Sequence, residues 1–313
     1  MRIQFYKILA VVFAGSIPFA CAKNKASAGC RTTKVIIVVM DGARYSETWG
    51  DPSHQHIPSL HSLANQGCVF TQFYKENHTY TCSGHTEMLT GVDQEIDNGG
   101  NELPYYASFM QYALAQYDAP QNNAWVIASK EKLHVLTNCQ HVSMAGKNNP
   151  AFTVGVNGIG TGNCHDSITI QRVYSTMSQY APDFMLINFR EPDFSAHAFD
   201  SLGYLKGIRY VDSCFNMIYN WTQTMSAYTG KTALFLTNDH GRHLNGVADG
   251  YAGHGDLCEG CRHIFLYATG PDFRKNASVA THYQLRDIAA TVAFMLKLKM
   301  PYNQGKVITD LFK

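Results

Sequence analysis

Five short runs of apolar residues, separated by longer segments with helical spacing, constrain the fold of this chain most. They occupy residues 35–39, 124–128, 184–188, 233–237 and 264–268. The first run contains only valine and isoleucine, which is typical of a strand buried on both faces of a sheet. Between the runs, apolar residues recur at three- and four-residue intervals, as at Val211, Phe215 and Ile218. This alternation predicts an α/β fold with a mostly parallel central sheet and helices on both faces.

Composition favours one domain and argues against binding to nucleic acid. The 313 residues are 45% hydrophobic, which is enough for a sizeable core. Lys and Arg number 25 against 24 Asp and Glu, so no excess of positive charge would attract a nucleic-acid polymer. Because no repeat or low-complexity tract divides the chain, we expect a single domain over residues 34–313, with a Gly- and Asn-rich surface excursion at 138–164.

Residues 1–22 have the pattern of an export signal. A positively charged start is followed by an apolar stretch too short to span a bilayer, and then by small residues. The segment ending at Cys21 resembles a relaxed bacterial lipobox, which predicts a lipid anchor on Cys21; ordinary cleavage after Ala22 is the alternative. We therefore expect an exported protein, periplasmic or a membrane-anchored bacterial lipoprotein, with residues 23–33 as a tether.

The cysteines fit the same interpretation. Without Cys21, eight of the nine cysteines remain, an even number in a compartment where disulfides persist. Their pairing cannot be read from the sequence. Cys258 and Cys261 form a single CxxC motif, either a tight disulfide or half of a zinc knuckle. Since no second CxxC exists, a disulfide or two free thiols is favoured over a structural zinc.

Acidic and imidazole side chains follow three of the apolar runs. In open α/β sheets, sites form just beyond the carboxyl ends of the strands. Aspartate and histidine together are typical zinc ligands, although an isolated Asp-Gly is commonly a turn and an isolated His is commonly structural. The candidate metal ligands are Asp41, Asp193, His197, Asp239, His240 and, in a glycine-rich loop, His254.

Residues 79–91 are rich in hydroxyl groups and lead into a segment with helical character. A hydroxyl at a helix N-terminus meets unpaired amides and the positive end of the helix dipole, which suits an anionic group. A helix cap by Thr81 or Ser83 is the alternative.

These motifs together, in this order over positions 41–254, resemble the alkaline phosphatase superfamily. The closest likeness is to its threonine-nucleophile phosphodiesterase/nucleotide pyrophosphatase branch and its phosphate-irrepressible phosphatases. The resemblance implies an alkaline phosphatase-like sandwich, with residues 34–313 as one catalytic domain. It implies that Thr81, in the Thr-x-x-x-His…Thr-Gly pattern, is the nucleophile.

The resemblance also implies that the protein binds two divalent metal ions and that both are zinc. Asp41, Asp239 and His240 would hold one ion, which Thr81 would also contact, and Asp193, His197 and His254 would hold the other. Sulfatases of the superfamily instead carry a formylglycine-forming residue inside Cys-x-Pro-x-Arg. That pattern is absent around Cys82, so we expect Cys82 to be a packed side chain.

Two further residues are predicted to contact the substrate. Asn101 lies where related phosphodiesterases carry an oxyanion-binding asparagine, with Asn98 as the competitor. Lys130 resembles the first position of the Lys-x-Arg phosphate clamp, but Lys132 replaces the arginine; a solvated surface pair is the alternative.

The expected function is an exported two-zinc phosphoric ester hydrolase, a phosphatase or phosphodiesterase, acting on a small phosphorylated substrate through a phosphothreonine intermediate. The alternatives are a phosphoryl or phosphoethanolamine transferase, a sulfatase-like hydrolase, and a non-catalytic binding module of the same fold.

Overall fold

The computed structural model describes residues 29–313, so the predicted export signal, Cys21 and most of the tether lie outside the described residues. Within residues 29–313, nine strands form a single sheet in the order β4-β3-β5-β1-β6-β7-β2-β8, with β9 beside β2. The strands are β1 (Lys34–Met40), β2 (Cys68–Tyr74), β3 (Ala124–Ala128), β4 (Ala151–Val154), β5 (Phe184–Phe189), β6 (Thr232–Thr237), β7 (His263–Thr269), β8 (Ala277–Val279) and β9 (Tyr283–Gln284).

All five apolar runs of the sequence form strands, and the α/β fold class is confirmed. The sheet is mostly parallel, as expected. In the described part of the chain only β7 is antiparallel to its neighbours, β6 and β2. The stretch 138–164, which we expected to be a surface excursion, also contributes β4 at the edge of the sheet.

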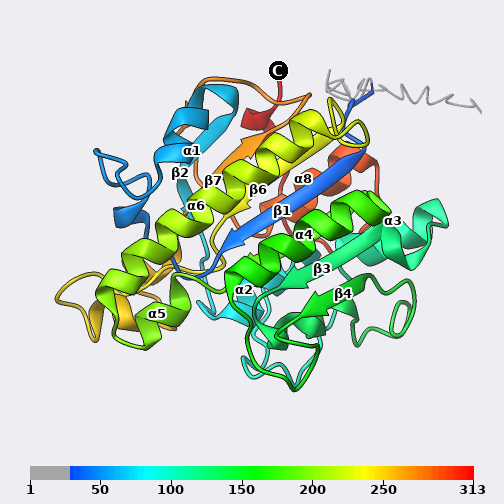
Figure 1. Cartoon of the computed structure of the whole chain (residues 1–313). Helices are drawn as coiled ribbons and strands as arrows, with labels where there is room; N and C mark the ends of the chain where they lie inside the picture. Colours follow the sequence, from blue (N-terminus) through cyan, green and yellow to red (C-terminus); the bar gives the residue numbers. More distant parts are fainter. Residues whose placement is uncertain (1–28) are drawn as a thin grey trace, which may run out of the picture.

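Helices cover both faces of the sheet (Figure 1). They are α1 (Pro58–Leu63), α2 (Thr81–Thr90), α3 (Phe109–Tyr117), α4 (Asp166–Tyr180), α5 (Asp193–His197), α6 (Ser201–Thr224), α7 (Glu259–Arg262) and α8 (Asp287–Leu296). Val35, Ile37 and Val39 of β1 pack in one core with α2, α3 and α8, and the intervening residues of β1 pack with α1, α4 and α6. The central strand is therefore buried on both faces, which explains its continuous apolar run.

The sheet brings distant parts of the chain to one edge. β1 lies between β5 and β6 and is parallel to both, so the three strands end side by side. Residues that follow these strands are far apart in the sequence but adjacent in space. No helix in residues 29–313 has both the length and the apolar character needed to span a membrane.

Helix α2 is held firmly beside this edge. All ten of its residues are buried. Glu87 in the helix forms an ion pair with the fully buried Lys75 at 2.5 Å, and Lys75 also contacts Asp93 at 2.8 Å. Gly84 lets the helix approach the loop after β6, because a Cβ there would lie 2.2 Å from the carbonyl oxygen of Asp239.

Candidate active site

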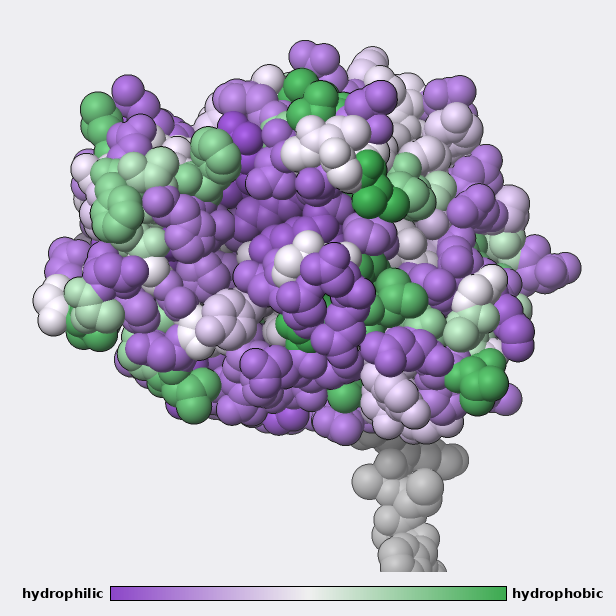
Figure 2. Space-filling view, turned by 90° about the horizontal axis from the view of Figure 1, so that it is seen from below, coloured by the Kyte–Doolittle hydropathy of each residue, from purple (hydrophilic) through white to green (hydrophobic). Residues whose placement is uncertain are grey.

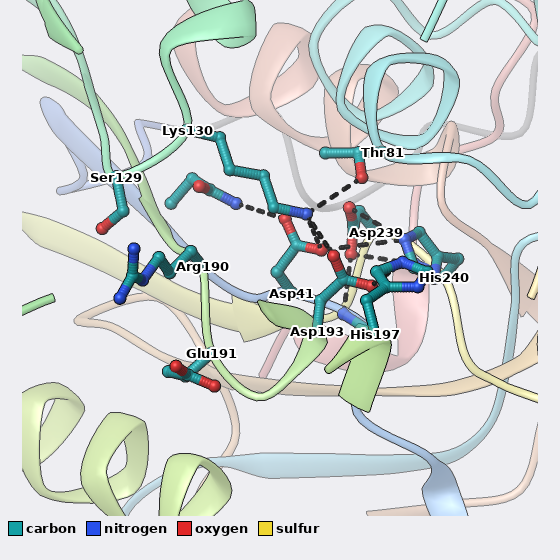
Figure 3. A network of polar contacts seen from close by, with 12 residues as sticks. Asp41, Thr81, Ser129, Lys130, Arg190, Glu191, Asp193, His197, Asp239 and His240 are labelled. Carbon is teal, nitrogen blue, oxygen red and sulfur yellow. Dashed lines mark hydrogen bonds and ion pairs between the residues drawn. The ribbon is translucent and has the colours of Figure 1, made fainter. Parts of the chain in front are cut away.

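Side chains from five segments meet at the carboxyl edge of the sheet (Figure 3). Asp41 follows β1, Lys130 follows β3, Asp193 begins α5 after β5, Asp239 follows β6, and Thr81 begins α2. Seen from below in Figure 2, the surface on this side of the molecule is mainly hydrophilic and is hollowed. The topology therefore collects the predicted residues at one place.

Lys130 lies at the centre of these side chains. Its Nζ atom is 2.8 Å from Asp41 Oδ1, 2.6 Å from Asp193 Oδ2 and 3.2 Å from Thr81 Oγ1. Burial favours the neutral amine, but Asp193 and Asp41 outweigh burial and raise the pKa of Lys130 above its ordinary value. A permanent positive charge therefore lies within hydrogen-bonding distance of the Thr81 hydroxyl.

Asp41, Asp239 and His240, which we call the inner group, are completely buried. Asp239 Oδ1 accepts hydrogen bonds from the backbone amides of Gly42 and His240, each at 3.1 Å. Gly42 has a positive φ of 67°, which suits glycine, and a Cβ there would lie 2.9 Å from the Arg242 guanidinium. This backbone bonding leaves Asp239 Oδ2 buried without a partner.

The imidazole of His240 also has a buried atom without a hydrogen-bond partner. Its Nδ1 atom is 2.9 Å from the carbonyl oxygen of Gly241, so Nδ1–H donates and Nε2 keeps its lone pair. That Nε2 atom is buried without a partner, 3.6 Å from Asp239 Oδ2 and 3.7 Å from Asp41 Oδ1. Burial lowers the pKa of His240 well below its ordinary value, so the imidazole stays neutral. An orphaned carboxylate oxygen facing an orphaned imidazole nitrogen fits a bound cation.

His85 lies beside the inner group, although it was not among the predicted metal ligands. It lies one helical turn after Thr81 in α2, and ligand atoms of Asp41, His85 and Asp239 lie within 4.8 Å of one another. Its Nδ1 atom bonds the Thr81 carbonyl oxygen at 2.8 Å, and its Nε2 atom lies 3.2 Å from the Asn188 amide. Both ring nitrogens therefore have partners, whereas His240 has a free lone pair. The four-residue spacing between Thr81 and His85, one helical turn, is the sequence feature that could have predicted this position.

Asp193, His197 and His254, which we call the outer group, have ligand atoms within 4.8 Å of one another. The Nε2 atoms of the two histidines are 3.1 Å apart, and His254 Nδ1 bonds the Thr79 carbonyl oxygen at 2.8 Å. Burial lowers the pKa of His254 to about 4, which keeps its Nε2 atom available as a ligand.

Two cations balance the charge of the outer group. Burial alone would raise the pKa of Asp193, but Lys130, the imidazole of His197 and Arg242 hold it well below its ordinary range. Arg242 is completely buried and pairs with Asp193 Oδ1. Its donors also reach the carbonyl oxygens of Tyr251 and Ala252, so it links α5 to the loop that carries His254.

The structure separates the two candidate asparagines. Asn101 does not reach the other site residues, because its side-chain amide donates to Asp97 at 2.9 Å on the surface. Asn98 does reach them: its Oδ1 atom accepts from the Cys82 backbone amide at 3.1 Å and from Lys132 Nζ at 3.0 Å. The turn at 97–101 thus places Asn98 at the start of α2 and Asn101 on the surface, so position favours Asn98 for the predicted role.

A pocket of about 430 Å³ opens beside Thr81. Its lining residues are Thr81, Asn98, Lys130, Lys132, Asn163, Asp193, Phe194, His197, Ala198 and His254. Two lysines and two asparagines in this lining suit an anionic ligand. Neither Asn163 nor the inward position of Lys132 was assigned from the sequence.

Cys82 is not among the residues that line this pocket. Its side chain is completely buried in the apolar core on the α2 side of the sheet, and burial raises its thiol pKa to about 11. The expectation of a packed side chain at this position is confirmed. The eight cysteines in residues 29–313 are all free thiols.

Comparisons with known proteins agree with this architecture. A family model described as Sulfatase matches residues 33–295, and no curated protein matches the chain significantly. A protein of the alkaline phosphatase superfamily from Vibrio parahaemolyticus has a TM-score of 0.68 at 13% identity, covering 92% of this chain and 72% of that one. Phosphonate monoester hydrolase from Silicibacter pomeroyi has a TM-score of 0.61 at 12% identity, with coverages of 89% and 76%.

Murine ectonucleotide pyrophosphatase/phosphodiesterase 5 has a TM-score of 0.60 at 15% identity, and the alignment covers 90% of this chain and 100% of that one. An inactive threonine-to-alanine variant of that murine protein is known in complex with AMP. At these identities the similarity to solved structures establishes the fold.

Proposed function

Because the chain belongs to the sulfatase family, within the metal-dependent hydrolases of the alkaline phosphatase superfamily, we propose that it hydrolyses phosphoric esters through Thr81. One observation carries this proposal. The Thr81 hydroxyl lies at the N-terminus of α2, 3.2 Å from the Lys130 ammonium, and Lys130 in turn contacts one carboxylate of each ligand group.

Thr81 is the group positioned to attack phosphorus. A threonine hydroxyl needs activation at neutral pH, and the adjacent ammonium of Lys130 favours its ionised form. The positive end of the α2 dipole acts in the same direction. Attack would form a phosphothreonine and release the alcohol, and water would then hydrolyse the phosphothreonine.

The inner and outer groups would each hold one divalent ion, most simply zinc. When bound, the two ions supply positive charge that lowers the pKa of the Thr81 hydroxyl and stabilises the entering and leaving oxygens. The orphaned Asp239 Oδ2 and His240 Nε2 atoms are the feature that fits this role.

Lys130, Lys132 and the Asn98 amide would bind the non-bridging oxygens. Asn98 Oδ1 is already engaged by Cys82 and Lys132, which leaves the Nδ2 hydrogens free to donate into the pocket. Two ammonium groups match the charge of a phosphate dianion better than that of a diester monoanion, so we infer a preference for small monoesters.

Sulfatase chemistry is the competing activity in this family. It would need a formylglycine at the nucleophile position, and the only cysteine beside Thr81 has its side chain in the apolar core. The murine neighbour, which is inactivated by a threonine-to-alanine change and binds AMP, supports phosphorus over sulfur as the reacting atom. Export remains a proposal based on residues 1–22, with Cys21 as the proposed lipid anchor.

Substituting Thr81 with alanine and with serine tests the nucleophile. Purified, zinc-supplied protein is assayed on nitrophenyl phosphate, bis-nitrophenyl phosphate and nitrophenyl sulfate. We expect Thr81→Ala to lose at least about 10³-fold in kcat and Thr81→Ser to retain measurable turnover, with metal content unchanged in both. Quenching the parent during turnover should trap a phosphorylated peptide containing Thr81. Full turnover by Thr81→Ala, or cleavage of the sulfate ester alone, would overturn the proposal.

A further inference from the structure

A third cluster of ligand-type side chains includes residues from the loops that carry His240 and His254. Ligand atoms of His243, Asp256, Cys258 and Cys261 all lie within 4.8 Å of one another. None of the four belongs to the inner or outer group. The cluster combines two sulfur atoms, one imidazole nitrogen and one carboxylate oxygen, and these are the atom types that tetrahedral zinc sites use.

The imidazole of His243 is oriented as a ligand. Its Nδ1 atom contacts the Asp249 carboxylate at 2.5 Å, which fixes the proton on Nδ1 and leaves a lone pair on Nε2. The side chain is 9% exposed, and its Nε2 atom is buried with no hydrogen-bond partner, 3.2 Å from Asp256 Oδ2. A buried imidazole nitrogen directed at a carboxylate and two thiols requires a proton or a metal ion between them.

The two thiols face the same point. Asp256 Oδ1 accepts from the Cys258 backbone amide at 2.9 Å, and α7 then carries Cys261 back towards the carboxylate. One ligand atom from each of Asp256, Cys258 and Cys261 lies within 4.8 Å of the others. Both sulfur atoms remain free thiols. The CxxC motif thus gains a second pair of ligands from residues that lack any CxxC spacing.

We propose that His243, Asp256, Cys258 and Cys261 form a structural zinc site, separate from the proposed catalytic ions. Such a site needs no second CxxC motif, because imidazole and carboxylate groups can supply the other two ligands. The fold instead supplies His243 from the loop after β6 and Asp256 from the loop after His254.

Such a site would fasten together the loops that carry two catalytic ligands. The Gly241 amide donates to the Cys261 carbonyl oxygen at 2.8 Å, and the His243 amide donates to the Gly253 carbonyl oxygen at 3.0 Å. A metal ion joining His243 to α7 would therefore fix the positions of His240 and His254 relative to each other without contacting substrate. This role does not depend on which ester the active site cleaves.

Cobalt substitution of the full-length protein tests the proposal directly. Loading metal-depleted, reduced protein with Co²⁺ alone should produce a thiolate-to-cobalt charge-transfer band in the near ultraviolet, because this is the one candidate metal group within residues 29–313 that contains cysteine sulfur. The band should persist in Asp239→Asn, which alters the inner group, and disappear in the double variant Cys258→Ser/Cys261→Ser. Cys30→Ser is the matched control, because Cys30 is a half-buried cysteine elsewhere in the described chain.

Metal analysis gives a second measurement that does not need the variants to be active. The parent and Cys30→Ser should each contain about one more zinc per chain than the double variant. Absence of the thiolate band from the cobalt-loaded parent would overturn the proposal, whether or not the variants fold. So would a Cys258–Cys261 disulfide in the purified protein, found by peptide mapping, or equal zinc content in all three proteins.

Discussion

The inner and outer groups use the same ligand types in very different surroundings. Asp41, Asp239 and His240 of the inner group have no exposed surface and follow two neighbouring strands. In the outer group, the side chain of His197 is 51% exposed and comes from the five-residue helix α5. One group is therefore fixed by the sheet, whereas the other borders solvent on a short helix and a loop.

This difference predicts different metal affinities and roles. Leaving a buried polar atom without a partner costs roughly 1–3 kcal/mol, and the inner group has two such atoms. A cation that pairs with them regains this energy, so the inner group should bind metal more tightly. The outer group lines the pocket, so in the proposed reaction water and the leaving group would exchange there.

The largest loss is expected from Asp239→Asn in the inner group. An amide cannot replace the charge of the orphaned carboxylate, and removing one metal ion from a two-metal site costs several kcal/mol, or about 10³-fold in kcat. Zinc analysis should show that one ion is lost. In contrast, His197→Ala in the outer group should lose only about 10²-fold, and added zinc should restore part of the activity. Equal losses and equal rescue by zinc would show that burial does not distinguish the groups.

A smaller effect is expected on the pH dependence of stability of the metal-free protein. Burial lowers the pKa of His254 from 6.5 to about 4, and burial also lowers the pKa of His240 well below its ordinary value. The unfolded chain binds protons at these histidines below about pH 6.5, whereas the folded chain does not. The free energy of unfolding should therefore fall as pH decreases, by about 2 kcal/mol from His254 alone between roughly pH 8 and pH 5.

Urea unfolding at the two pH values measures this change. His254→Gln should remove the part of the pH dependence that comes from the outer group. The remaining change in the free energy of unfolding with pH should then come from His240 in the inner group. If the free energy of unfolding changes with pH as much in His254→Gln and His240→Gln as in the parent, the two imidazoles are not buried in the neutral form.

The smallest effect separates the two asparagines. Asn98→Ala should lower kcat/KM about tenfold, because one donor to the substrate and the contact with the α2 N-terminus are lost. Asn101→Ala should change kcat/KM less than about twofold, since its amide contacts only Asp97. A larger loss in Asn101→Ala than in Asn98→Ala would show that Asn101 is the asparagine that binds the substrate.

Much of the central sheet could be predicted because its strands are buried on both faces. Such strands are uniformly apolar, and the predicted run 124–128 coincides with β3. The peripheral strands β4, β8 and β9 are short and partly exposed, so they carry no comparable run. β2 includes the polar pair Thr71 and Gln72 at a register shift, which interrupts its apolar pattern.

The candidate site was predictable where ligands follow apolar strands and unpredictable where turns decide direction. Asp41 and Asp239 could be located because each comes directly after a buried run. Asn98 and Asn101 lie three residues apart in one turn, and only the backbone path determines which one faces the pocket. The partnership of His243 with Cys258 and Cys261 likewise arises from folding of two loops, which no local spacing encodes.

The strand order also governs when the ligands for the proposed metal ions first come together. β1 is synthesised early but lies at the middle of the sheet, between strands that leave the ribosome much later. The Gly42 amide, for example, bonds a carboxylate 197 residues further along the chain. A nascent polypeptide lacking its final third therefore has Asp41 but no complete ligand set. Binding of the proposed metal ions thus requires synthesis at least as far as His254, and products truncated before it should be inactive as well as unstable.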